Sequence, residues 1–218
     1  MVKKALFFFV IVLVCRFSVE AQPFFQEVDT FSKIDAERPP PPNAILFIGS
    51  SSFKLWKGVD SSFPGKTIIN RAFGGSSLTH QIDYIDKIIY PYDPRQIVVY
   101  CGENDIAESK LVTADTVLQR FKRLHALIRN KYPKVPISFV SIKPSPVRAE
   151  FLSTVVESNK LIKSFCKRSK RTDFIDVFTP MLGLDNKPRE DIFLSDRLHM
   201  NKNGYTIWKK SIEPYLIN

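Results

Sequence analysis

The sequence predicts an α/β domain built on a parallel sheet with helices on both faces. Short, β-branched or aromatic apolar segments alternate along the chain with longer segments of helical periodicity. Polar residues follow several of the apolar segments directly, as they do where parallel strands end at a site. With 218 residues, 44% hydrophobic and 25% charged, the composition is globular and the length fits one large core.

Five short apolar segments, each bounded by Gly, Pro, Asn or Asp, predict the strands. They are residues 44–48 (AILFI), 67–70 (TIIN), 97–101 (IVVYC), 137–142 (ISFVSI) and 174–177 (FIDV). Apolar stripes predict helices over 113–132, from 152 to at least 162, and around 207–212. Strands that are apolar throughout, joined by helices, are typical of parallel sheets buried on both faces.

The first 21 residues read as a cleavable secretory signal peptide. Two lysines precede an uninterrupted apolar segment, 5–15, and small residues at 19 and 21 suit a cleavage site before Gln22. The apolar segment is shorter than the ~20 residues of a membrane-spanning helix. We therefore expect a secreted or periplasmic protein without stable membrane insertion. A lipoprotein anchor at Cys15 is the alternative, which Val14 disfavours because that position is normally small.

An N-terminal arm, 22–43, follows the signal peptide. Val28, Phe31 and Ile34 have helical spacing, and the prolines at 39–42 require an extended segment after them. No repeat or second linker follows, so 44–218 is expected to form one domain.

Charge and cysteine content exclude several classes of protein. The signal segment holds three basic residues and one acidic residue, so its removal lowers the net charge from +10 to about +8. Such a charge could attract nucleic acid or other polyanions, but the densest cluster, 167–171, ends a predicted helix, where solvated cations are ordinary. No nucleotide-binding glycine motif and no CxxC pair occurs. We expect neither metal nor cofactor, and no nucleic-acid partner.

Four polar blocks carry the residue types that acyl transfer requires. They are 49–52 (GSSS), 70–76 (NRAFGGS), 102–105 (GEND) and 196–199 (DRLH). The reaction needs a hydroxyl nucleophile, a base oriented by a third group, and donors for an oxyanion. A serine follows the first strand, and Asp196 can orient His199, three residues on. Gly75 can offer a backbone N–H and Asn104 an amide N–H.

In this order, the four blocks resemble those of the SGNH hydrolases, also called the GDSL esterases and lipases. The resemblance spans 44–218. It implies a three-layer α/β/α sandwich with a central five-stranded parallel sheet, of flavodoxin-like type, and ester hydrolysis without a metal. By the family's pattern, Ser51, Asp196 and His199 are the catalytic residues. The Ser51 and Gly75 N–H groups and the Asn104 side chain form the oxyanion hole.

The sequence departs from the family's first block, because Ser50 and Ser52 replace its Asp and Leu. The nucleophile is therefore ambiguous between Ser51 and Ser50, and Gly74 competes with Gly75 as the donor. Asp105, beside Asn104, is expected either to orient its neighbours or to cap a helix. The sequence does not show whether Cys101 and Cys166 pair, or the oligomeric state.

The substrate is the least determined feature. No long apolar insertion interrupts the four blocks, which favours a short acyl group. Secretion, together with Arg71 and Glu103 near the site, favours an acetylated carbohydrate, as for carbohydrate O-acetylesterases of the family. Phe53, Trp56 and Phe73 could instead line an apolar groove, as expected for a lysophospholipase or short-chain lipid esterase resembling platelet-activating-factor acetylhydrolases. A catalytically silent glycan-binding domain is a further alternative.

Overall fold

The computed structural model describes residues 24–217, and the predicted signal segment lies outside them. The strands are β1 (Ile45–Gly49), β2 (Ile68–Asn70), β3 (Gln96–Tyr100), β4 (Ile137–Val140) and β5 (Thr172–Ile175). The α-helices are α1 (Phe25–Glu37), α2 (Ser51–Lys54), α3 (Val59–Ser62), α4 (Leu78–Asp83), α5 (Ile85–Ile88), α6 (Glu103–Glu108), α7 (Ala114–Lys131), α8 (Leu152–Arg168) and α9 (Lys202–Ile212). Three short 3-10 helices are η1 (Pro146–Phe151), η2 (Thr179–Met181) and η3 (Glu213–Tyr215).

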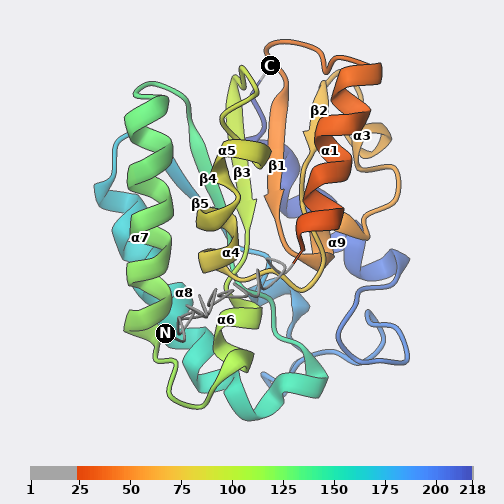
Figure 1. Cartoon of the computed structure of the whole chain (residues 1–218). Helices are drawn as coiled ribbons and strands as arrows, with labels where there is room; N and C mark the ends of the chain where they lie inside the picture. Colours follow the sequence, from red (N-terminus) through yellow and green to blue (C-terminus); the bar gives the residue numbers. More distant parts are fainter. Residues whose placement is uncertain (1–23, 218) are drawn as a thin grey trace, which may run out of the picture.

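The five strands form one parallel sheet in the order β2-β1-β3-β4-β5 (Figure 1). This is the flavodoxin-like order, in which the direction of winding reverses between β1 and β3. The predicted fold class is confirmed. In such sheets ligands bind beyond the carboxyl ends of the strands at that reversal. Here the first block follows β1 and the third block follows β3.

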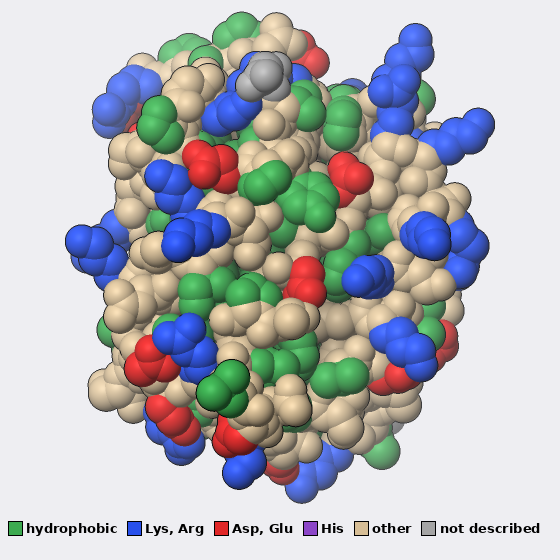
Figure 2. Space-filling view, turned by 180° about the vertical axis from the view of Figure 1, so that it is seen from behind, with side chains coloured by type: hydrophobic (Ala, Val, Ile, Leu, Met, Phe, Trp, Pro, Cys, Tyr) green, Lys and Arg blue, Asp and Glu red, His purple; other side chains and the backbone are tan. Residues whose placement is uncertain are grey.

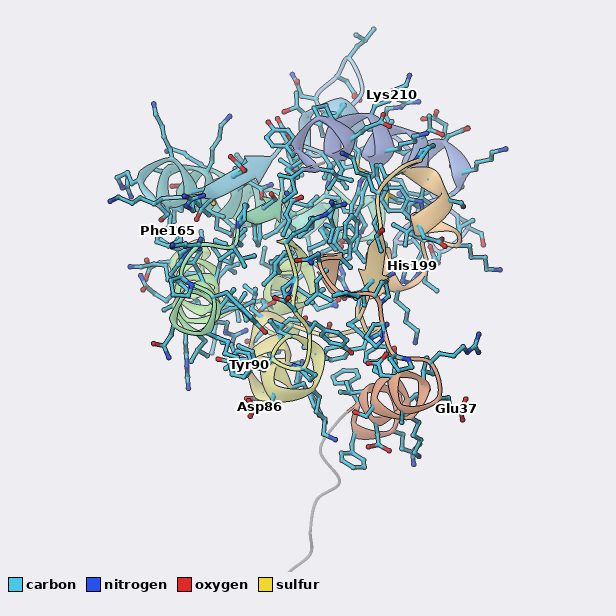
Figure 3. The ribbon with its side chains drawn as sticks, turned by 90° about the horizontal axis from the view of Figure 1, so that it is seen from above. Glu37, Asp86, Tyr90, Phe165, His199 and Lys210 are labelled. Atoms are coloured by element: carbon cyan, nitrogen blue, oxygen red, sulfur yellow. The ribbon has the colours of Figure 1, made fainter. Side chains whose placement is uncertain are left out.

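The sheet separates two apolar cores because its strands are buried on both faces. Along β1, Leu46 and Ile48 pack with α4, α5, α7 and α8, whereas Ile45 and Phe47 pack with α2, α3 and α9. The view from above shows the two layers, with Glu37 and Asp86 on one side of the sheet and Lys210 on the other (Figure 3). An uninterrupted apolar strand is therefore the correct signature of this sheet.

Helix α1 lies against the first of these cores, beside α5 (Figure 1). Val28 is fully buried, and Phe31 packs against the core from the same face. Cys101 and Cys166 are buried free thiols. Between residues 24 and 217, no helix has the length and apolarity needed to cross a membrane.

Candidate active site

The first block forms a sharp turn from β1 into α2, and Ser51 is the first residue of that helix. Gly49 has φ +136°, and a Cβ there would lie 1.9 Å from the Tyr100 carbonyl oxygen. Only glycine fits this approach of β1 to the end of β3. The turn thus holds Ser51 at the carboxyl end of the sheet, next to the end of β3.

The fourth block forms a tight turn that brings Asp196 and His199 together. Asp196 Oδ1 accepts hydrogen bonds of 2.9 Å from the Leu198 and His199 N–H groups. Its Oδ2 lies 2.6 Å from His199 Nδ1. The hydrogen bonds from these backbone N–H groups, that of His199 first, lower the pKa of Asp196 to about 2. The carboxylate therefore stays ionised over the pH range in which esters are assayed.

His199 reaches Ser51 rather than Ser50. His199 Nε2 lies 3.1 Å from Ser51 Oγ, across 148 residues of sequence. Ser50 instead places its Oγ 2.7 Å from Asn104 Nδ2. The three residues Ser51, His199 and Asp196 form a continuous chain of polar contacts, in the arrangement of a nucleophile, its base and the group that orients the base.

Asn104 is held in one orientation by contacts on both ends of its amide. Nδ2 donates to the Ser76 carbonyl at 2.9 Å as well as to Ser50. Its Oδ1 accepts from Arg148 at 2.9 Å. An inverted amide would set its NH₂ group against the Arg148 guanidinium. Arg148, on η1, is a positioning residue that the sequence analysis missed.

A buried polar cluster around Glu103 lies next to Arg148. Glu103 Oε2 accepts from Lys143 Nζ at 2.6 Å and from the Tyr100 hydroxyl at 2.9 Å, and its Oε1 lies 3.6 Å from Arg148. Ser145 also donates to Glu103. Burial raises the pKa of Glu103, but the charges of Lys143 and Arg148 outweigh it, so this pKa lies below its usual value. The cluster fixes the start of α6, where Asn104 sits.

Gly75 follows a turn that leaves its N–H available. Its φ of +73° favours glycine. Within residues 24–217, neither the Gly75 N–H nor the Ser51 N–H has a hydrogen-bond acceptor. The Gly74 N–H, by contrast, donates to Glu27 Oε1 at 3.1 Å. Gly75 is therefore the better candidate for an oxyanion donor.

Glu27 links α1 to two parts of the site. Besides accepting from Gly74, its Oε1 lies 2.8 Å from Lys54 Nζ, on α2. Phe24 packs over the same turn, because a Cβ at Gly75 would lie 3.6 Å from its ring. The N-terminal arm thus holds the glycine turn against the helix that begins at Ser51, which the sequence analysis did not predict.

Asp105 is fully buried and contacts no part of the Asn104 side chain within the described residues. It accepts from the Leu78 N–H at 2.9 Å, at the start of α4, and from Arg120 at 2.8 Å. It therefore ties α6 to α4 and α7. Asp105 thus accepts from the first turn of α4 and not from its own neighbour Asn104.

Arg71 and Glu103, whose polarity favoured a glycan substrate, both form their polar contacts with other residues of the protein. Arg71 pairs with Asp35 of α1, lies 5.1 Å from the centre of the Tyr92 ring, and has a side chain only 12% exposed. Glu103 is 7% exposed. Neither side chain is placed to contact a substrate. Phe53, Trp56 and Phe73 are core residues.

The contacts among Ser51, His199 and Asp196 have the geometry expected of a serine-type hydrolase. Residues 50–207 match the model of the GDSL-like Lipase/Acylhydrolase family, and the chain belongs to that family. The predicted enzyme class, a carboxylic ester hydrolase, is confirmed. No curated protein sequence matches this chain.

Solved structures share the fold at low sequence identity. A protein from Streptococcus pneumonia, named for platelet activating factor, is 23% identical, with a TM-score of 0.75 over 88% of this chain and 92% of its own. A GDSL-like lipase from Bacteroides thetaiotaomicron is 19% identical, with a TM-score of 0.72 over 86% and 96%. Axe2, an acetyl-xylooligosaccharide esterase from Geobacillus, is 13% identical, with a TM-score of 0.64 over 79% and 93%.

Proposed function

We propose that the protein removes short acyl groups, above all acetyl, from a carbohydrate ester through an acyl-enzyme on Ser51. The chain of contacts from Ser51 through His199 to Asp196 carries this proposal. The acetyl and carbohydrate specificity draws support from the four blocks, which no long apolar insertion interrupts. The likeness to an acetyl-xylooligosaccharide esterase also supports it.

In the first half of the reaction, Ser51 Oγ attacks the ester carbonyl carbon while its proton passes to His199 Nε2. Asp196 holds the His199 tautomer that bears hydrogen on Nδ1 and stabilises the imidazolium that forms. The tetrahedral oxyanion accepts from the N–H groups of Ser51 and Gly75 and from Asn104 Nδ2. His199 then donates its proton to the leaving alcohol, and the carbon–oxygen bond breaks to leave an acyl-serine.

In the second half, His199 takes a proton from water, whose oxygen attacks the acyl-serine carbonyl. Collapse of the second tetrahedral intermediate releases the carboxylic acid and returns the proton to Ser51 Oγ. No cofactor enters either half. In the free protein, one hydrogen of Asn104 Nδ2 is donated to the Ser76 carbonyl and the other to Ser50 Oγ. We assign the hydrogen that faces Ser50 to the oxyanion.

The test is hydrolysis of p-nitrophenyl acetate, butyrate and octanoate by residues 22–218. We expect the acetate to have the highest kcat/KM, followed by release of acetate from O-acetylated oligosaccharides. A clear preference for octanoate would replace the carbohydrate ester with the lipid esterase alternative. A folded protein that hydrolyses none of these esters, and no acetylated oligosaccharide, would contradict the proposal and favour a silent binding domain.

Replacing Asn104 with alanine is expected to lower kcat for p-nitrophenyl acetate about 10²- to 10³-fold, because one oxyanion donor is lost. KM should change little, since the donor acts mainly on the transition state. Steady-state kinetics and a thermal unfolding midpoint measure the two effects. The matched control is Asn130→Ala, an exposed amide on α7, which should retain kcat. A loss of less than fivefold at Asn104 would contradict its assignment.

A further inference from the structure

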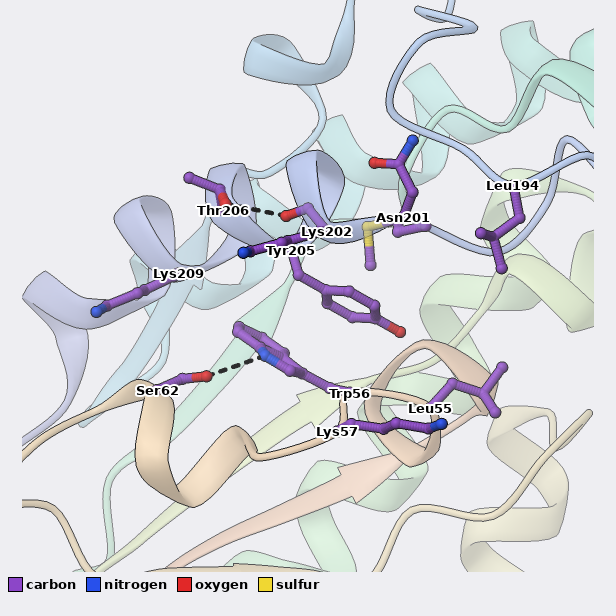
Figure 4. A pocket seen from close by; sticks show the side chains of 11 residues that line it. Leu55, Trp56, Lys57, Ser62, Leu194, Asn201, Lys202, Tyr205, Thr206 and Lys209 are labelled. Atoms are coloured by element: carbon purple, nitrogen blue, oxygen red, sulfur yellow. Dashed lines mark hydrogen bonds between the residues drawn. The ribbon is translucent and has the colours of Figure 1, made fainter.

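A groove of about 560 Å³ lies between the segment that follows α2 and helix α9 (Figure 4). Leu55 and Leu194 form the walls at one end. The Leu55 N–H donates to the Ser51 carbonyl and the Leu194 N–H donates to the His199 carbonyl, both at 2.8 Å. The backbone at this end is therefore hydrogen-bonded to that of Ser51 and His199, which lie next to the lining residues but not among them.

Aromatic and apolar side chains line the middle of the groove. The rings of Trp56 and Tyr205 lie 5.1 Å apart with an interplanar angle of 33°, and the Tyr205 hydroxyl donates to the Ser52 carbonyl at 3.0 Å. That bond ties the groove to the residue after Ser51. Leu55 and Leu194 are 42% and 51% exposed. The groove thus offers apolar surface to part of a substrate that reaches Ser51.

Among residues 24–217, three lysines and no acidic residue line the groove: Lys57, Lys202 and Lys209. None of the three forms an ion pair with another residue of the described part of the chain. The other polar side chains in the lining are already used, since Asn201 caps α9 and Thr206 bonds to the Lys202 carbonyl. The groups left to a ligand are therefore cations and apolar surface.

The cations extend along the groove rather than meeting at one point. Lys202 and Lys209 are seven residues apart on α9, which is about 10 Å along a helix, and Lys57 comes from the opposite wall. Figure 2 shows the molecule from behind, where Lys and Arg side chains lie around apolar ones with some Asp and Glu side chains among them. Charges spread over this length suit a linear ligand with repeated negative charges better than a single headgroup.

We propose that the groove binds an acidic oligosaccharide whose sugars carry carboxylates, and that it thereby selects acetylated esters of such glycans as substrates. The inference rests on the proposed esterase function and specifies its substrate class. The sugar bearing the acetyl group lies at Ser51. The sugars next to it pack their apolar faces over Leu55, Leu194 and the exposed part of Tyr205, with their carboxylates beside the three lysines.

The test compares kcat/KM for acetate release from an O-acetylated oligouronide and from a neutral O-acetylated xylo-oligosaccharide of equal length. We expect the oligouronide to be preferred, and the preference to weaken between 50 mM and 500 mM NaCl. A K57Q/K202Q/K209Q variant should lower the preference about tenfold, mainly through KM. The matched control, K122Q/K167Q/K170Q, changes as many lysines at α7 and the end of α8 and should retain the preference.

The outcomes separate the two proposals. Equal kcat/KM for both glycans, or an equal loss of the oligouronide preference in the two triple variants, overturns the groove assignment. In that case, Ser51-dependent hydrolysis of p-nitrophenyl acetate still upholds the esterase function. Preference for an anionic lysophospholipid over both glycans overturns the glycan assignment in favour of a lipid. Absence of hydrolysis of every ester by the folded protein overturns both proposals.

Discussion

Replacing Ser51 with alanine is expected to lower kcat for p-nitrophenyl acetate by about 10⁴-fold or more, to a residual rate supplied by binding and the oxyanion donors. The hydroxyl removed is the one 3.1 Å from His199 Nε2. Ser50 cannot replace it without moving the turn, because Ser50 Oγ is directed at Asn104. Steady-state kinetics at saturating substrate measure the effect.

Ser50→Ala is the matched control for this prediction. It removes one hydroxyl from the same turn. Within the described part of the chain that hydroxyl accepts from Asn104 alone, and the contacts of Asn104 with Ser76 and Arg148 remain. We expect less than a tenfold loss of kcat. Labelling with a fluorophosphonate followed by peptide mass spectrometry should place the adduct on Ser51. An adduct on Ser50, or a Ser51→Ala enzyme of near-normal rate, would reassign the nucleophile.

The strands could be predicted from the sequence because a parallel sheet is buried on both faces, so its strands appear as continuous apolar segments. The predicted strand ends were less accurate, because pairing with a neighbouring strand determines where each strand begins and ends. In β5, Thr172 pairs with Ile137 and so begins the strand, although it is not apolar. Val177, predicted to lie in that strand, instead donates its N–H to the Ser141 hydroxyl. Such long-range contacts leave no local pattern.

The same reasoning explains which parts of the candidate site were predictable. The four blocks could be found because each holds its polar residues within a few positions of a strand end or within one turn. Arg148 and Glu27 could not, because they act on Asn104 and Gly74 from 44 and 47 residues away. Arg71 was misinterpreted for a similar reason, since its partner Asp35 lies in the arm.

Replacing Asp196 with asparagine is expected to lower kcat about 10³- to 10⁴-fold while leaving the turn folded. The asparagine Oδ1 must keep accepting from the Leu198 and His199 N–H groups, as Asp196 Oδ1 does. Its Nδ2 then takes the place of Oδ2, 2.6 Å from His199 Nδ1. Because an amide nitrogen donates only, the imidazole must carry its proton on Nε2, the nitrogen that has to accept from Ser51.

Arg197→Gln is the matched control, because Arg197 lies in the same turn but pairs with Glu190 and, within residues 24–217, forms no hydrogen bond or ion pair with His199. It should retain kcat within about threefold, since an exposed ion pair contributes little. Kinetics and thermal midpoints of both variants distinguish loss of the turn from loss of the tautomer. If Asp196→Asn kept its midpoint and lost less than tenfold in kcat, another group would have to orient His199. If the midpoint is kept and kcat falls as expected, the tautomer of His199 is the property that Asp196 controls.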